Sequence, residues 1–329
     1  MKSDDGAHVR SGWRAAIPAI AGIIAIVAGA SIFSDIDRLG ARLGEIGPTP
    51  IVLALTLALG NFAIRFVRWQ LYVRRVATAG QIPIKTSLLV FLAGFAMSVT
   101  PGKVGELLKA VLLKQSTGVP MARTAPLVVA ERLTDLVALL VLGLIGTAIY
   151  GIAFSMVVAG AVAIAVFLAV LASPPLVRGI IRKVGALPRL RRYEAKLHEL
   201  YDNLTSLLRP GPLAWATSLA VLAWLCECVG FALIVNAVPA ATVPVGLATL
   251  IYAATTMAGA LSFLPGGLVV TEASMVLLLV CSAKGLDEPG ALAATLVTRL
   301  CTLWFAVVLG LLALVAARRV PRHRSPTSG

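Results

Sequence analysis

Eleven ionisable side chains lie inside long apolar stretches of this 329-residue sequence, and their types could do chemistry there. Each costs roughly 2.5–3.5 kcal/mol at the centre of a membrane helix, so they must contact one another or line a wet cavity. Such a set could bind a charged group, pass protons, or act as a scaffold of ion pairs. Its members are Arg65, Arg68, Lys103, Glu106, Lys109, Glu131, Arg132, Asp135, Glu227, Glu272 and Arg299.

Two of these residues also have a simpler explanation. Arg68 could extend to the membrane surface, as we expect of Arg74 and Arg75 at the end of the same helix. Glu106 lies in the first turns of the helix that follows Pro101, where the helix dipole stabilises a carboxylate. Thr100 would cap that helix, and proline is tolerated at its first position.

Two proline–glycine breaks interrupt apolar sequence that is otherwise suited to a bilayer. The first contains Pro101 and Gly102, and the second contains Pro265, Gly266 and Gly267. Broken backbone at membrane depth is tolerated only beside protein or water, so we predict two re-entrant hairpins, at about 84–113 and 244–281. The helices that start at Gly102 and Gly266 would favour an anionic group, and Lys103, Arg132 and Arg299 would strengthen that preference.

Composition sets the class of protein. The chain is 59% hydrophobic and 13% charged, with mean hydropathy +0.93, which predicts an all-α polytopic membrane protein. Its net charge of +14 sits mostly between apolar runs, as the positive-inside rule explains, so we expect no nucleic-acid partner. The four cysteines lack metal-ligand spacing and the three histidines lie outside the apolar runs, so no metal or other cofactor is expected.

About six membrane spans are predicted beside the two hairpins, in one membrane domain covering residues 1–329. A signal peptide cleaved near Ala28–Ala30 is the alternative for the first span, but Pro18 and a run of about 19 apolar residues favour a retained helix. Loop charges place both termini and the first hairpin on the cytoplasmic side, and the second hairpin on the outside. The spans are at about 15–33, 51–76, 124–150, 152–172, 213–238 and 290–316.

The segment from 173 to 212 is a strongly basic loop expected in the cytoplasm. Within it, aromatic and leucine side chains from Tyr193 to Leu208 recur at helical spacing on one face. They predict a helix that either lies along the membrane surface or packs onto the end of the bundle, and the pattern favours neither.

The two halves of the chain resemble each other. When Pro101 is aligned with Pro265, Gly102 falls on Gly266, and with a shift of three residues Arg132-Leu133 falls on Arg299-Leu300. Gly143 then matches Gly310. Three spans separate the hairpins, which would turn the second half over, so we predict an inverted repeat of about 51–172 and 213–316, an arrangement common in transporters.

Three motifs resemble the flippase-like transmembrane domain of the lysylphosphatidylglycerol synthases, over about residues 17–316. The motifs are Pro101-Gly-Lys-Val-Gly-Glu106 with Lys109, Glu131-Arg132-x-x-Asp135, and Pro265-Gly-Gly with Glu272. Lys109 stands where we would expect arginine, and lysine does not bind phosphate bidentately. The resemblance implies movement of lipid between leaflets of a bacterial inner membrane. Because the sequence ends at Gly329 without the synthase domain, we do not expect an enzyme.

The leading functional prediction is therefore a flippase-like transporter of an anionic phospholipid or polyprenyl-phosphate lipid. Its head group would enter a polar cavity between the hairpins while its tail stays in the bilayer. One alternative is a non-transporting accessory subunit that binds a lipid-modifying enzyme or glycosyltransferase through the basic loop. Another is an intramembrane enzyme with Glu131 and Asp135 as acid and base. A homo-oligomer is a further expected form of partnership.

Overall fold

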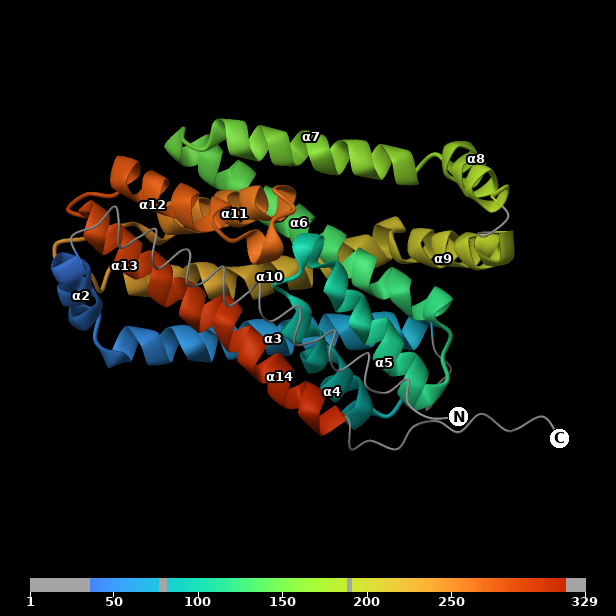
Figure 1. Ribbon diagram of the computed structural model, residues 1–329. Coiled ribbons are helices and arrows are strands. Elements are labelled where there is room, and N and C mark those ends of the chain that lie inside the picture. Colours follow the sequence, from blue (N-terminus) through green and yellow to red (C-terminus); the bar gives the residue numbers. More distant parts are fainter. Residues whose placement is uncertain (1–35, 77–81, 188–190, 318–329) are drawn as a thin grey trace.

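The computed structural model describes residues 36–76, 82–187 and 191–317, and nearly all of this part is helical (Figure 1). In these ranges six helices are long and apolar enough to cross a membrane. The prediction of an all-α polytopic membrane protein is confirmed to that extent. The six are Pro48–Val76, Met121–Tyr150, Phe154–Leu171, Pro210–Val235, Pro265–Ser282 and Glu288–Ala317.

Five of the predicted spans coincide with long helices of the structure. The first prediction, at about 15–33, lies outside the described residues. The sixth long helix, Pro265–Ser282, falls instead within the segment predicted to form the second hairpin. The matching helices are α3 (Pro48–Val76), α6 (Met121–Tyr150), α7 (Phe154–Leu171), α10 (Pro210–Val235) and the run α13 (Glu288–Arg299), η5 (Leu300–Trp304) and α14 (Phe305–Ala317).

Helices α3 and α10 pack extensively against each other in the middle of the bundle. Gly230 of α10 lies against the backbone of Ala54, which allows the two helices a close approach. The buried amide of Asn61 donates a hydrogen bond of 2.8 Å to the carbonyl of Ala223, so a polar contact also fixes the rotation of the pair. The charged face of α3 is thereby directed toward α6.

The first break separates α4 (Ile84–Gly94) and the short η1 (Phe95–Met97) from η2 (Pro101–Leu107) and α5 (Leu108–Thr117). Thr100 precedes η2, and its hydroxyl accepts a hydrogen bond of 2.8 Å from the Gly105 N–H. This bond reaches the fifth residue on and not the first turn, so the prediction that Thr100 caps the helix start is wrong. The helix after Pro101 starts as a 3₁₀ helix and becomes α-helical only at Leu108. Both α4 and η1 pack on α14, where Gly310 meets the backbone of Phe95 and Ala96.

The second break separates α11 (Val245–Leu261) from α12 (Val270–Ser282), with η4 (Pro265–Gly267) between them. Helix α11 packs on α6, where Gly146 makes room for Leu250. Gly143, the residue aligned with Gly310, faces Val157 of α7 instead. The two breaks contact each other, because η2 packs against η4.

Two helices form most of the basic segment that follows α7 (Figure 1). They are α8 (Pro174–Gly185) and α9 (Glu194–Leu207). Helix α9 packs on α6 and buries Tyr201, Leu204 and Leu207, and the Tyr201 hydroxyl donates a 2.8 Å hydrogen bond to the Leu171 carbonyl. The two alternatives for this helix were the membrane surface and the end of the bundle. These three buried residues pack onto the bundle.

A short helix and a π-helical turn complete the described part. Helix α2 (Ile36–Glu45) packs on α13, which links the start of the described chain to its last long helix. Between α13 and α14, the π-helical turn η5 follows directly on Arg299. Such turns often occur at functional sites, because one extra residue per turn redirects the neighbouring side chains.

Candidate functional site

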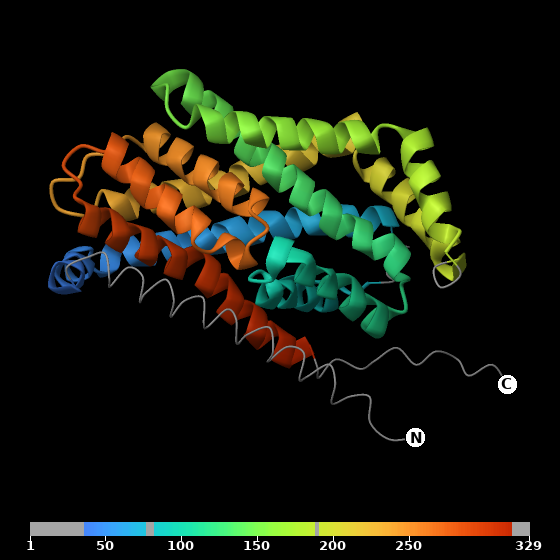
Figure 2. The same cartoon turned by 45° about the horizontal axis from the view of Figure 1, so that its top comes forward.

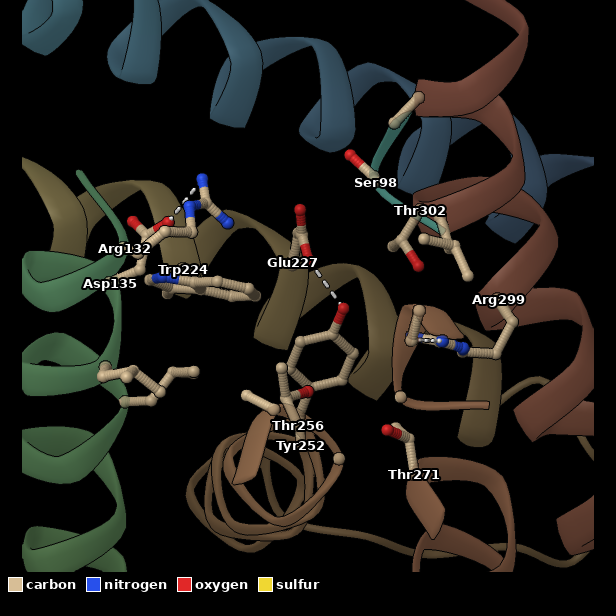
Figure 3. A pocket seen from close by; sticks show the side chains of 18 of the residues that line it. Ser98, Arg132, Asp135, Trp224, Glu227, Tyr252, Thr256, Thr271, Arg299 and Thr302 are labelled. Carbon is tan, nitrogen blue, oxygen red and sulfur yellow. Dashed lines mark hydrogen bonds and ion pairs between the residues drawn. The ribbon is translucent and has the colours of Figure 1, made fainter. Parts of the chain in front are cut away.

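A cavity of about 230 Å³ lies where the two breaks meet the long helices (Figure 3). Its walls come from α3, η1, η2, α6, α10, α11, the loop around η4, α12, α13, η5 and α14. Six of the predicted charged residues line it, together with Gly266 and Gly267 of the second break. The six are Arg65, Glu106, Arg132, Asp135, Glu227 and Arg299.

Asp135 is the centre of a buried ion network on one side of the cavity. Its Oδ1 lies 2.7 Å from Arg68 Nη2, and its Oδ2 lies 3.3 Å from Arg65 Nη2 and 3.0 Å from Arg132 Nη2. Arg68 also donates to the Thr134 hydroxyl at 3.1 Å and is fully buried. The reading of Arg68 as a residue that extends to the membrane surface is therefore wrong, because a carboxylate one helix away holds it inside.

The network continues through Glu106 to Lys109. Glu106 Oε2 lies 3.3 Å from Arg132 Nη2 and 3.4 Å from Lys109 Nζ, and its Oε1 accepts a hydrogen bond from the Ser98 hydroxyl. Lys109 Nζ also lies 3.0 Å from Glu131 Oε2. Glu106 is thus held by two cations and a hydroxyl, in addition to any effect of the helix dipole.

Aromatic rings surround the ammonium group of Lys109. Its Nζ lies 5.3 Å from the ring centre of Trp69, 5.0 Å from that of Phe91 and 5.9 Å from that of Phe95. The stem of the side chain passes directly over Gly94. Ring faces attract a desolvated cation, so this cage compensates part of the cost of burying the charge.

The second half of the chain carries a smaller ion pair of the same kind. Arg299 Nε donates to Glu272 Oε1 at 2.6 Å, and Arg299 Nη2 donates to the Gly266 carbonyl at 2.9 Å. Arg299 therefore ties the start of α12 and the second break to α13. In both halves the arginine of the aligned Arg-Leu pair forms an ion pair with a glutamate that follows the proline–glycine break.

Glu227 and Tyr252 form a third polar feature between these two groups. The Tyr252 hydroxyl donates to Glu227 Oε2 at 2.6 Å, across from α11 to α10 (Figure 3). Both residues are buried and both line the cavity. A short hydrogen bond to a charged acceptor is among the stronger ones, so it holds this carboxylate in place.

The other predicted residues lie outside the cavity lining. Lys109, Glu131 and Glu272 are buried behind it, each in an ion pair with a neighbour. The surroundings of Gly102 and of the Lys103 side chain are not described, and Pro101 is exposed. The ten charged members with described side chains comprise five cations and five anions, so the full set of eleven is positive only through Lys103.

The sequence did not indicate several uncharged members of the cavity wall. Ser98, Trp224, Tyr252 and Thr256 all line it. Trp224 Nε1 is buried and has no hydrogen-bond partner among the described residues. Trp224 precedes Glu227 by three residues and so shares its helical face, a signal that could have identified it. An aromatic residue in an apolar helix is usually assigned to the core.

Within the described ranges there is no group of three or more His, Cys, Asp or Glu side chains that could hold a metal ion. The chemistry that the arrangement does offer is charge recognition. Three cavity-facing residues carry buried N–H donors without a partner among the described residues: Arg65 Nε, Arg132 Nε and Trp224 Nε1. A buried donor of this kind is costly unless water or a ligand supplies an acceptor.

Comparison with known proteins covers nearly the whole chain. The sequence profile described as "Lysylphosphatidylglycerol synthase TM region" matches residues 20–310. The chain is also 24% identical, over 324 aligned residues, to a "UPF0104 membrane protein" of Methanothermobacter thermautotrophicus, and the alignment covers 92% of this chain and 95% of that relative. The profile match is to the membrane region of the synthases.

Proposed function

The chain belongs to the lysylphosphatidylglycerol synthase TM region family, and from that premise we propose that it moves an anionic lipid between bilayer leaflets. The lipid is a phospholipid or a polyprenyl phosphate. Its head group enters the cavity between the two breaks, while its hydrocarbon tail stays in the surrounding bilayer. The cavity lowers the cost of carrying a charged group through a layer that otherwise excludes it.

The observation that carries this proposal is a set of N–H donors beside the cavity that have no partner among the described residues. Arg65 Nε, Arg132 Nε and Trp224 Nε1 are buried N–H groups of cavity-lining residues on three different helices. In Figure 3, Trp224 lies next to Arg132 and Asp135 on the same side of the cavity. A phosphate has several oxygen acceptors and would bond such donors by charge-assisted hydrogen bonds.

The proposal includes two re-entrant segments, at about 84–113 and 244–281, and an inverted repeat of about 51–172 and 213–316. Reciprocal packing supports it. The first arm of each interrupted segment packs on the long helix that follows the other interrupted segment, α4 on α14 and α11 on α6. The two arginine–glutamate pairs, Arg132–Glu106 and Arg299–Glu272, occupy matching places in the halves. A twofold arrangement of this kind would let each half open in turn.

Transport is tested with purified protein in proteoliposomes that contain a fluorescent phosphatidylglycerol, in a dithionite quenching assay. We expect the wild-type protein to expose inner-leaflet probe, and Arg132→Ala and Glu106→Gln to abolish this exchange while eluting as folded protein. Arg123→Gln is the matched control, because Arg123 pairs with Glu199 at the exposed surface. If the wild-type protein moves neither this lipid nor a labelled polyprenyl phosphate, the proposal fails.

A further inference from the structure

Helix α8 carries an apolar face that the protein covers only in part. Ile181 is buried and Val177 and Val184 are half-buried, on the side where α8 contacts α9. Beside them Leu176 and Ile180 are each 49% exposed, and Leu187, just beyond the end of the helix, is 54% exposed. At 100° per residue, positions 176, 180 and 187 fall within one narrow strip. This strip adjoins the covered face and continues it.

Basic side chains occupy the remaining surface of α8, with Arg178 and Arg182 opposite the strip and Lys183 beside it. Arg178, Arg182 and Lys183 are exposed, and no acidic residue lies in the helix. Arg178 makes one ion pair of 3.4 Å with Asp202 of α9, in which both side chains are more than half exposed. Such an exposed pair is worth little, so it leaves most of the positive field available. The helix is therefore amphipathic, with a cationic polar side.

The position of α8 places this strip at the end of a membrane span. Only Ala172 and Ser173 separate it from α7, and in Figures 1 and 2 it turns across the end of that helix. Helix α7 is apolar and mostly exposed, as expected of a lipid-facing span. The Tyr201 hydroxyl on the Leu171 carbonyl fixes the junction. An 18-residue helix is about as long as the hydrocarbon core is thick, so the chain just after Leu171 is expected near the bilayer surface.

We propose that α8 is a membrane-surface helix that binds a leaflet containing anionic lipid. Leu176, Ile180 and Leu187 insert among the acyl chains just below the head groups, and Arg178, Arg182 and Lys183 contact lipid phosphates. Apolar insertion and attraction to anionic head groups act together in such helices. The complementarity of charge favours this occupant over a protein partner. This surface is separate from the cavity and does not depend on lipid transport.

The test is hydrogen–deuterium exchange of the full chain in two kinds of nanodisc. One kind contains phosphatidylcholine alone, and the other contains phosphatidylcholine with a third of phosphatidylglycerol. We expect the amides of α8 to exchange on the order of tenfold more slowly in the anionic nanodiscs, because three cations of the helix are attracted to the charged surface. The amides of α10 should exchange equally in both. Arg178→Gln/Arg182→Gln/Lys183→Gln should remove the difference.

Two further variants make the outcome decisive. Arg191→Gln/Arg192→Gln/Lys196→Gln removes the same charge from exposed residues of η3 (Arg191–Tyr193) and α9, and it should keep the difference. Leu176→Ser/Ile180→Ser should speed exchange of α8 in both nanodiscs. The proposal is overturned if α8 exchanges at the same rate in the two lipids. It is also overturned if both triple variants lose the difference alike, since the effect would then come from net charge alone.

Discussion

The two breaks meet at one cavity but are built in different ways. At the first, Thr100 and Glu106 hold the chain through side-chain contacts, and the ion network there joins four cations to three anions. At the second, tight backbone holds the loop, with positive φ at Gly266 and Gly267 and also at the non-glycine residues Phe263 and Val269. A single ion pair, Arg299–Glu272, then ties it to α13. The first break depends on charge and the second on backbone shape.

The largest expected effect follows from removing the carboxylate at the centre of the first network. Asp135→Asn leaves Arg65, Arg68 and Arg132 without their common partner in a buried place, at a cost of about 3–5 kcal/mol. Glu272→Gln should cost less, about 1–3 kcal/mol, because Arg299 keeps its hydrogen bond to the Gly266 carbonyl. Thermal unfolding of both variants in one detergent measures the difference. An equal or larger loss for Glu272→Gln would contradict the comparison.

Hydropathy and backbone chemistry made much of the fold predictable. The ranges of α3, α6, α7 and α10 follow from runs long enough to cross a bilayer, and the breaks follow from proline and glycine. Arg132 and Arg299, which the internal repeat singled out, both line the cavity. These features depend on neighbours in the chain, which the sequence displays directly.

The remaining details depend on contacts across the bundle. Arg68 lies on the predicted charged face of α3, but only the rotation of α3 against α6 decides that it meets Asp135 rather than the membrane surface. The three rings around Lys109 come from α3, α4 and η1. Trp224 and Tyr252 look like core residues until the cavity beside them is known. Tertiary packing sets all of these.

Backbone shape at the second break gives the next prediction. Gly267 has φ +67°, and a Cβ there would lie 3.1 Å from the Cα of Gly259, so Gly267→Ala should cost about 1–3 kcal/mol. Gly151→Ala is the matched control. Gly151 has φ +70° with open space around it, so alanine there is destabilising only through its unfavourable backbone conformation. In thermal unfolding, the melting temperature of Gly267→Ala should be lower than that of Gly151→Ala.

At the first break the corresponding change is Gly105→Ala. A Cβ there would lie 2.7 Å from Met97 Cβ and from both γ atoms of Thr100, so these neighbours must move, but Gly105 has no positive φ. We expect a loss of stability from this crowding alone, and a smaller one than for Gly267→Ala, where crowding adds to an unfavourable backbone conformation. A larger loss would show that the first break is as constrained in its backbone as the second.

Lysine and arginine should not be interchangeable between the two halves, and each exchange should lower the free energy of unfolding by about 1–2 kcal/mol. Lys109→Arg places a wider head group among three rings and over Gly94, where extra atoms force neighbours to move. Arg299→Lys keeps one charge but loses the fork that bonds both Glu272 and the Gly266 carbonyl. Thermal unfolding measures each loss. The control is Lys196→Arg, at an exposed position of α9. A neutral Lys109→Arg would refute the packing argument for lysine at this position.

The smallest effects belong to ion pairs outside the membrane. Asp287 precedes α13, accepts from the Gly290 N–H at 3.0 Å and pairs with Arg42 of α2 at 2.9 Å. Slight burial acts to raise the pKa of Asp287, but the hydrogen bonds from Arg42 and Gly290 outweigh it, and its pKa lies below the ordinary value. Its stabilising contribution is therefore complete above the ordinary aspartate pKa of about 4 and fades as the pH falls below that.

Asp287→Asn should accordingly cost about 0.5–1 kcal/mol at pH 7, and the gap to wild type should close as the pH falls below about 4. Glu199→Gln, which breaks the exposed pair with Arg123 beside the first half, should cost no more than about 0.5 kcal/mol. Asparagine still accepts from the Gly290 N–H, so the helix cap survives in Asp287→Asn, and the loss comes from the ion pair with Arg42 and from the negative charge at the start of α13. If Asp287→Asn were as mild as Glu199→Gln at pH 7, the charge at the start of α13 would add nothing to an ordinary exposed ion pair.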